Sequence, residues 1–313
     1  MPLLRRLVRF TLTVALGLAA LGARAADTPL SPGEHQITAN GLTLAYTVAG
    51  KGPVALVPAP GWGPSSQYLA LGLKPMEQWF TMVYVDPRGT GRSQAPAPGD
   101  VSWAMLVSDL EAVRAHLGQE RVWLVGHSMA GVMSTHYALS HPQRVGGLIL
   151  IGSLAAGDAA YGADMQRRMA RRKDQPWFPA ALKAMRENPA TQADLERGMR
   201  DMTPLYFARP ERIPQVASSL TSAPLSLAAW QGAGKRMPDV LSRLPEIKAP
   251  TLLVVGMEDF IASPAESTRL HRGIAGSKLL VIEDAGHFPW LEQPDAFFKG
   301  VRGFLPTLGY RPD

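Results

Sequence analysis

A serine in a tight run of small residues is the first group in this sequence that could act as a nucleophile. Ser128 stands in GHSMAG (residues 126–131), after an apolar β-type run at residues 122–125 and before a helical pattern. A serine on such a strand–turn–helix forms the nucleophile elbow G-x-S-x-G. Ala130 replaces the second glycine and adds one methyl group, which we expect the turn to tolerate. A lone serine after a strand is more often a helix N-cap, but the complete context favours a nucleophile.

A serine hydroxyl becomes a good nucleophile only when a base removes its proton. Of the seven histidines, only His287 lies in a loop directly after a predicted strand near the C-terminus. His127 directly precedes Ser128, and we expect its side chain to point away from the hydroxyl. The sequence therefore predicts that His287 is the base.

The base in turn needs a carboxylate that holds its tautomer and stabilises the imidazolium. The predicted strand 251–255 runs into a loop that contains Glu258 and Asp259. We prefer Asp259 as this acid, with Glu258 as the competing choice one residue away. The order Ser128, Asp259, His287 is the nucleophile–acid–base order of one α/β architecture.

Acyl transfer also requires N–H donors that bind the developing oxyanion. The Met129 N–H, at the start of the predicted helix, is one natural donor. The second should come from the loop after the predicted strand 54–57, which reads PAPGWG (residues 58–63). Because prolines cannot donate, we assign this donor to the Trp62 N–H.

A second glycine-rich stretch, DPRGTGRS (residues 86–93), follows the predicted strand 81–85. It lacks both the G-K-S/T ending and the G-x-G-x-x-G spacing of phosphate-binding loops. We interpret it as a structural turn in which Asp86 and Arg88 form a pair.

Strands that alternate with helices must position these groups, a pattern typical of a mostly parallel sheet with helices on both faces. The Val/Ile/Leu-rich runs predict eight strands, at residues 35–39, 43–48, 54–57, 81–85, 122–125, 148–151, 251–255 and 278–282. The first two form an antiparallel hairpin. Helical patterns occupy about residues 103–117, 129–140, 264–274 and 295–305.

Residues 153–244 interrupt this alternation with short amphipathic helices and many prolines. We predict a helical lid inserted into a core of residues 26–152 and 245–313, or alternatively a separate helical domain. The arginines at 167–172 either stay solvated or form an entrance for anionic substrates. Five lid aromatics either line an apolar acyl pocket or pack as ordinary core: Trp177, Phe178, Tyr206, Phe207 and Trp230.

The first 25 residues have the pattern of a secretory signal peptide. Arginines within residues 1–9 precede an apolar run of about 12 residues and an A-x-A site ending at Ala25. Such a run is too short for a membrane span, which needs roughly 20 residues. Cleavage after Ala25 removes four arginines and no carboxylate, so the formal net charge falls from +6 to +2. We expect a periplasmic or secreted protein with no stable membrane anchor and no nucleic-acid partner.

The composition is that of an ordinary globular protein, with 313 residues, 46% of them hydrophobic and 19% charged. The absence of cysteine excludes disulfides, thiolate metal sites and cysteine nucleophiles.

Together these motifs resemble the α/β-hydrolase superfamily, and in particular its lidded, proline-iminopeptidase-like group. The resemblance rests on GHSMAG, on DPRGTGRS, on GMED (residues 256–259) and on AGHF (residues 285–288), and it extends from about residue 34 to 305. It implies the α/β-hydrolase fold, a serine hydrolase with a catalytic triad, and no cofactor. One departure is Pro60, which stands where the group usually has a histidine before the oxyanion donor.

The sequence thus predicts an exported serine hydrolase that cleaves an ester or amide bond of a small-molecule or short-peptide substrate through an acyl-enzyme. Esterase-like chemistry is preferred. The alternatives are an aminopeptidase acting on short peptides and a non-catalytic ligand-binding protein on the same fold. We expect no metal, because the sequence has no H-E-x-x-H motif. The oligomeric state stays open.

Overall fold

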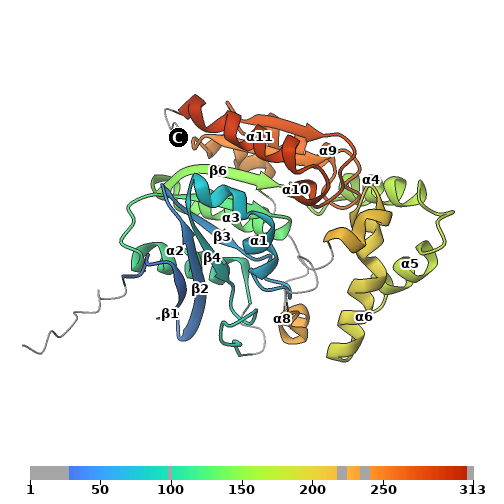
Figure 1. Cartoon of the computed structure of the whole chain (residues 1–313), viewed down its shortest axis with the longest axis horizontal. Coiled ribbons are helices and arrows are strands. Elements are labelled where there is room, and N and C mark those ends of the chain that lie inside the picture. The colour runs from blue at the N-terminus through green and yellow to red at the C-terminus, as the bar shows by residue number, and fades with distance from the viewer. Residues whose placement is uncertain (1–27, 98–100, 217–223, 233–239, 309–313) are drawn as a thin grey trace, which may run out of the picture.

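The protein is built on an eight-stranded sheet with the strand order β1-β2-β4-β3-β5-β6-β7-β8 (Figure 1). The computed structural model describes residues 28–97, 101–216, 224–232 and 240–308, so the predicted signal peptide lies outside the described residues. All eight predicted strands are confirmed: β1 (Gly33–Ala39), β2 (Leu42–Gly50), β3 (Val54–Pro58), β4 (Thr81–Asp86), β5 (Val122–His127), β6 (Val145–Ile151), β7 (Thr251–Gly256) and β8 (Lys278–Ile282).

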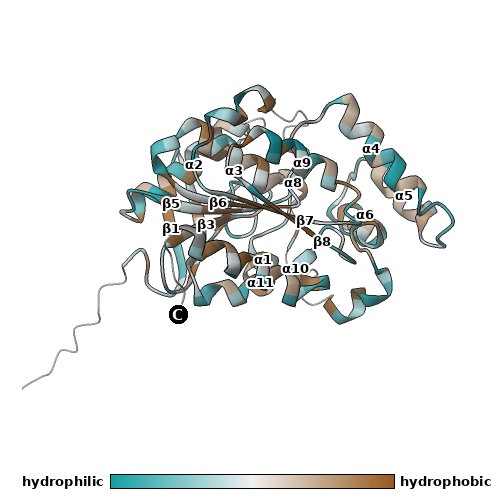
Figure 2. Ribbon diagram, turned by 90° about the horizontal axis from the view of Figure 1, so that it is seen from above, coloured by the Kyte–Doolittle hydropathy of each residue, from teal (hydrophilic) through white to brown (hydrophobic). Residues whose placement is uncertain are grey.

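Successive residues of the central strands enter two different apolar cores, one on each face of the sheet. In β3, for example, Leu56 packs into one core and Val57 into the other, and both are fully buried. Strands buried on both faces need apolar residues at every position. The helical layers over the two faces (Figure 2) consist of α2 (Trp103–His116), α3 (Met129–Ser140) and α9 (Pro264–Gly273) on one face, and α1 (Gln67–Gly72), α10 (Pro289–Glu292) and α11 (Pro294–Phe304) on the other.

The sheet is antiparallel only where β2 pairs with β1 and with β4. The pairs from β4 through β3, β5, β6 and β7 to β8 are all parallel. The carboxyl ends of these strands therefore meet at one edge of the sheet. In open α/β sheets, ligands bind in the crevice at this edge.

Between β6 and β7, the described residues form helices and 3₁₀ turns and contain no strand. We call residues 153–244 the lid. Its helices gather to one side of the sheet (Figure 1), and its elements are α4 (Ala159–Ala170), α5 (Phe178–Arg186), α6 (Gln192–Met202), η3 (Thr203–Tyr206), η4 (Pro210–Arg212) and α8 (Leu227–Gly232). Pro204 and Pro210 each stand in the first turn of a 3₁₀ helix, where a missing N–H costs little. Across the described ranges, no helix has the length and apolar character to cross a membrane.

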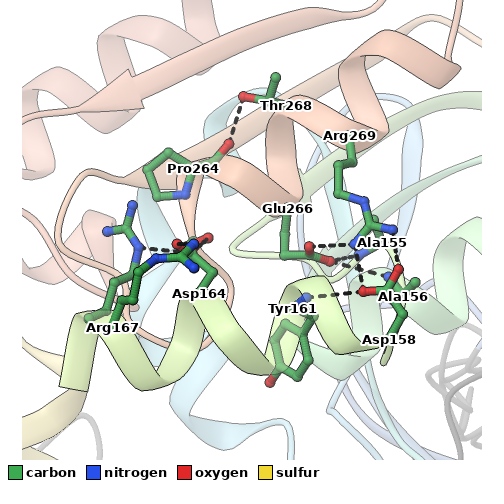
Figure 3. A network of polar contacts seen from close by, with 12 residues as sticks. Ala155, Ala156, Asp158, Tyr161, Asp164, Arg167, Pro264, Glu266, Thr268 and Arg269 are labelled. Atoms are coloured by element: carbon green, nitrogen blue, oxygen red, sulfur yellow. Dashed lines mark hydrogen bonds and ion pairs between the residues drawn. The ribbon is translucent and has the colours of Figure 1, made fainter. Parts of the chain in front are cut away.

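The first helix of the lid is tied to the core by a polar network with α9 (Figure 3). Asp158 caps α4 by accepting from the Tyr161 N–H at 3.0 Å. Arg269 of α9 pairs with Asp158 at 2.5 Å and with Glu266 at 2.9 Å. Glu266 also accepts from the Ala155 N–H at 3.0 Å. These contacts fix where the lid leaves the sheet.

The DPRGTGRS turn is structural, but the expected pairing within it is wrong. Arg88 binds Asp109 of α2 through two contacts of 2.7 Å, and both side chains are almost fully buried. Asp86 instead accepts from the N–H and the hydroxyl of Ser66, at 2.7 and 2.8 Å. Gly91 is needed because a Cβ there would lie 2.3 Å from an Asp86 oxygen. Gly91 also has a φ of +52°, which favours glycine.

The buried ion pair between Arg88 and Asp109 leads to a prediction about stability. We expect Arg88→Met to lower the free energy of unfolding by about 3–5 kcal/mol, because it leaves the Asp109 carboxylate buried without its partner. Urea unfolding measures the change. Arg92→Met is the matched control on the same turn. Arg92 pairs with Glu34 at 2.7 Å and lies 3.8 Å from Asp86, with its own side chain 37% exposed, and pairs of such exposed side chains contribute less than about 1 kcal/mol. Equal losses in the two variants would contradict the prediction.

Candidate active site

Ser128 occupies a sharp turn between β5 and α3, with φ 58° and ψ −126°. L-residues seldom adopt a positive φ, and such strain concentrates at functional sites. The Ser128 N–H donates to the Ile151 carbonyl at 2.9 Å. A Cβ on Gly126 would lie 2.7 Å from the Gly131 Cα, so the turn closes only around glycine. Ala130 is fully buried, and its methyl group is accommodated in this packed turn.

His287 and Asp259 form a buried hydrogen bond, with His287 Nδ1 and Asp259 Oδ2 2.7 Å apart. The other Asp259 oxygen accepts from the N–H groups of Ile261 and Ala262, at 3.0 and 2.9 Å. Glu258, by contrast, is only partly buried. The structure thus brings Asp259, rather than Glu258, to His287. A carboxylate oxygen only accepts, so His287 Nδ1 carries the proton and Nε2 is left as the basic nitrogen.

The serine turn and the His287–Asp259 pair meet at the end of β6. The Ser128 N–H is hydrogen-bonded to the carbonyl of Ile151, the last residue of β6. Gly152, which follows Ile151, lies directly against the His287–Asp259 pair. A Cβ on Gly152 would lie 3.1 Å from Asp259 Oδ2 and 3.2 Å from His287 Nδ1. Gly152 also has a φ of +49°. The loops after β5, β7 and β8 therefore converge around this one glycine.

His127 is buried beneath the site and binds the main chain of His287. Its Nε2 lies 3.0 Å from the His287 carbonyl oxygen, and its Nδ1 lies 2.9 Å from the Tyr68 hydroxyl. Because the carbonyl only accepts, Nε2 must carry the proton, and Tyr68 must donate to Nδ1. Burial, and to a smaller extent repulsion from His287, lowers the pKa of His127 well below its ordinary value. His127 is thus a neutral clamp on the histidine loop.

The two predicted oxyanion donors lie on neighbouring segments. Met129 is the first residue of α3, where helix N–H groups lack partners within the helix. Gly61, with a φ of +82°, turns the loop after β3 toward the same helix, and a Cβ on it would lie 3.5 Å from the Met133 side chain. Trp62 follows this turn. Its ring packs edge-to-face on Trp230 of the lid, with centroids 5.4 Å apart.

Two of the five predicted pocket aromatics contact site residues. The Tyr206 ring packs against the His287 ring at 5.4 Å, and Trp230 packs on Trp62. Trp230 also lines a cavity of about 600 Å³ between α5 and α6. The lid therefore contributes one aromatic ring beside His287 and one beside the loop of the predicted oxyanion donor Trp62.

The other three predicted pocket aromatics pack elsewhere. Trp177 and Phe178 belong to an apolar cluster that joins the lid, through the buried Leu205, to Phe260 of the acid loop. Phe207 is fully buried, with its ring 5.5 Å from that of Phe288. These positions correspond to the alternative of ordinary core packing.

The arginine-rich end of α4 has a role that neither interpretation of the sequence included. Arg168 donates to the Met257 carbonyl at 2.9 Å. Arg172 donates to the carbonyls of Phe207 and Glu258, at 2.9 and 3.0 Å. These two cations thus tie the lid to the loop that carries Asp259. Sequence offers no signal for such contacts, because any residue has a carbonyl.

The fold and this site define a known class of protein. Residues 61–294 match the sequence profile of the α/β-hydrolase fold. The chain belongs to this family, and the resemblance to the superfamily is confirmed. Its proline-iminopeptidase-like group is not singled out.

The similar proteins are hydrolases. The chain is 27% identical over 277 residues to the 2-hydroxy-6-oxononadienedioate/2-hydroxy-6-oxononatrienedioate hydrolase of Escherichia coli (strain K12), covering 84% of this chain and 91% of that protein. It is similar to a thermophilic esterase from Thermogutta terrifontis, with a TM-score of 0.63, 27% identity, and coverage of 88% and 98%. The enol-lactonase from Burkholderia xenovorans LB400 shares the fold, with a TM-score of 0.68, 24% identity, and coverage of 87% and 100%. The protein is therefore an α/β-fold hydrolase.

The neutral state of His127 predicts a specific pH dependence of stability. As the pH falls below about 6.5, the unfolded chain binds a proton at His127 that the folded protein does not, so acid favours unfolding. The loss is up to about 1.4 kcal/mol per pH unit until the pH reaches the folded pKa. His127→Gln cannot titrate and keeps an N–H for the His287 carbonyl. We expect its thermal midpoint to fall less than that of the wild type between pH 7 and pH 5.

His116→Gln serves as the control, because His116 is exposed on α2. It should keep the wild-type pH dependence. Parallel pH profiles for the wild type and His127→Gln would refute an uncharged His127 in the folded protein.

Proposed function

We propose that this protein is an exported serine hydrolase that cleaves esters of small, uncharged acyl groups through a Ser128–His287–Asp259 triad. The observation that carries the proposal is the buried His287–Asp259 pair, set against a serine in a strained turn. Nucleophile, base and acid in this arrangement recur in serine hydrolases of unrelated folds.

In the proposed reaction, His287 Nε2 takes the Ser128 hydroxyl proton as Oγ attacks the carbonyl carbon. The N–H groups of Met129 and Trp62 bind the oxyanion. The bond to the leaving group then breaks, His287 returns its proton to that group, and an acyl-enzyme remains. Water, activated by the same nitrogen, releases the acid and restores Ser128. Asp259 holds the imidazole and stabilises its cationic form in both steps.

The surroundings of the site support an uncharged acyl group. Tyr206, Trp62 and Trp230 offer aromatic surface. Arg168 and Arg172, which approach from the lid, already bind main-chain carbonyls. The name of the E. coli relative specifies a dioate substrate, which would need cations to hold its carboxylates. The esterase among the similar structures is the better guide to substrate class.

One observation favours a second candidate, an aminopeptidase. Asp201 lines the lid cavity together with Trp230, whereas Glu187 and Asp194 in the same lining pair with Lys183 and Arg197. A carboxylate there would suit the free amine of an aminoacyl substrate. Both candidates use the same triad, so they differ only in substrate.

The function predicts that a fluorophosphonate probe labels the wild-type protein and does not label Ser128→Ala. We expect Ser128→Ala to lower kcat by about four to six orders of magnitude. Asp259→Asn should lower it about 10⁴-fold, the loss that this exchange causes in serine proteases. Glu258→Gln is the matched control and should change kcat little. A folded wild type without labelling would indicate a ligand-binding protein, and full activity in Asp259→Asn would exclude Asp259 as the acid.

A substrate panel separates the two candidates. We expect p-nitrophenyl esters to be hydrolysed with a higher kcat/KM than aminoacyl-nitroanilides. The reverse order would favour the aminopeptidase. Among the esters, a terminal carboxylate on the acyl chain should lower kcat/KM.

The proposed export depends on residues 1–25 alone. We expect the N-terminal sequence of the protein recovered from the periplasm or medium of a bacterial host to begin at Ala26. Replacing the arginines within residues 1–9 by glutamate should block export, because the basic n-region is part of the signal. Recovery of exported protein that still begins at Met1 would refute cleavage.

A further inference from the structure

The ring of His287 can act only if the loop that carries it is held in place. This loop follows β8 and has no regular structure before α10 begins at Pro289. Its main chain is nevertheless bonded at successive positions. The His287 N–H donates to the Tyr206 carbonyl at 2.7 Å, the His287 carbonyl accepts from His127, and the Gly286 N–H donates to a Glu292 oxygen at 2.6 Å.

Glu292 is the charged side chain in this set, and it is only 6% exposed. One oxygen accepts from Gly286 in the histidine loop. The other accepts from the N–H groups of Ala208 and Arg209, at 2.8 and 3.3 Å. Those two residues belong to the lid and lie 84 and 83 positions away in the chain. A single carboxylate therefore joins the lid to the loop of the catalytic base.

The contact between lid and loop is close. A Cβ on Gly286 would lie 2.2 Å from the Tyr206 carbonyl oxygen and 2.9 Å from the Ala208 nitrogen. The same lid segment is also held by Arg172, which donates to the Phe207 carbonyl. On the exposed edge, Arg209 pairs with Asp284 at 2.5 Å. Residues 206–209 thus form a strap across the His287 loop.

A buried carboxylate is costly unless its hydrogen bonds compensate for lost hydration. Burial raises the pKa of Glu292, and its main-chain N–H partners oppose that rise. A packing role alone would be met more cheaply by an apolar side chain. Three N–H donors converging from two segments instead need an acceptor with two oxygens. Gln is nearly isosteric but presents an NH₂ group to one set of donors.

We propose that Glu292 is a positioning residue for His287, which it aligns by binding the Gly286 N–H while it anchors the lid strap 206–209. The proposal rests on the triad function above. Glu292 acts through the main chain and does not contact the reacting atoms. A displacement of about 1 Å in a catalytic group can cost about 10²-fold in rate, so the effect should appear in kcat.

The test compares Glu292→Gln with Glu292→Asp, using a p-nitrophenyl ester. We expect Glu292→Gln to lower kcat about 10- to 100-fold while KM changes less than about threefold. Glu292→Asp keeps both oxygens on a shorter side chain and should recover part of kcat. Glu283→Gln is the control, because Glu283 is exposed at the start of the same loop. It should retain the wild-type kcat.

A second readout needs no turnover. The proton between His287 Nδ1 and Asp259 gives a far-downfield NMR signal in a well-aligned pair, and we expect Glu292→Gln to broaden or abolish it at unchanged far-UV circular dichroism. This arm separates the two ideas. An unlabelled, inactive wild type would refute the hydrolase function, whereas the signal still tests the hold of Glu292 on His287.

An unchanged kcat together with an unchanged signal in Glu292→Gln would overturn the proposal. The proposal would also be overturned if both Glu292 variants lost kcat equally and in proportion to the fall in their thermal midpoints. That pattern would indicate that Glu292 affects only the stability of the fold. If Glu292→Gln does not fold, Glu292→Asp decides. A lowered kcat at wild-type KM supports positioning, and wild-type kinetics refute it.

Discussion

The hydrogen bond between His287 Nδ1 and Asp259 Oδ2 sets the requirements that the surrounding structure meets. Its carboxylate is fully buried, so its oxygens must all be bonded. It therefore accepts from two N–H groups of its own loop as well as from His287. The bond also requires β7 and β8 to be parallel neighbours with their carboxyl ends level, and Gly256 pairs with Ile282 at that edge. A Cβ on Gly256 would lie 2.1 Å from the Gly286 carbonyl, so only glycine allows the two loops to approach.

The segment that we call the lid is part of the site's architecture. Arg172 and Arg168 of the lid bind carbonyls of the acid loop, and the Tyr206 carbonyl of the lid accepts from the His287 N–H in the base loop. Glu292 of α10 accepts from N–H groups of both the lid and the base loop. Charged groups that bind main-chain atoms make stronger hydrogen bonds than neutral ones. The same contacts withdraw the two arginines from substrate recognition. The same hydrogen bonds therefore hold both the lid and the loops that carry Asp259 and His287.

Much of the fold could be predicted because its signals are local. Strands buried on both faces read as continuous apolar runs, and the turn at Ser128 needs small neighbours that the sequence displays directly. The Asp86–Arg88 pairing was wrong for the converse reason. Nearness in the chain does not determine which carboxylate a buried arginine meets, and Arg88 reaches Asp109, 21 residues away, because α2 packs over that turn.

The sequence by itself determined the class of fold, the serine in its turn, and the histidine and acidic loops after the last two strands. Those features follow from hydrophobic periodicity and from the backbone demands of a tight turn. Only the tertiary structure decided that Asp259 rather than Glu258 meets His287, and that His127, Arg172 and Glu292 hold the loops around the site. Side-chain direction in a loop, and the choice of hydrogen-bond partner among many equivalent main-chain groups, depend on which distant segments pack together.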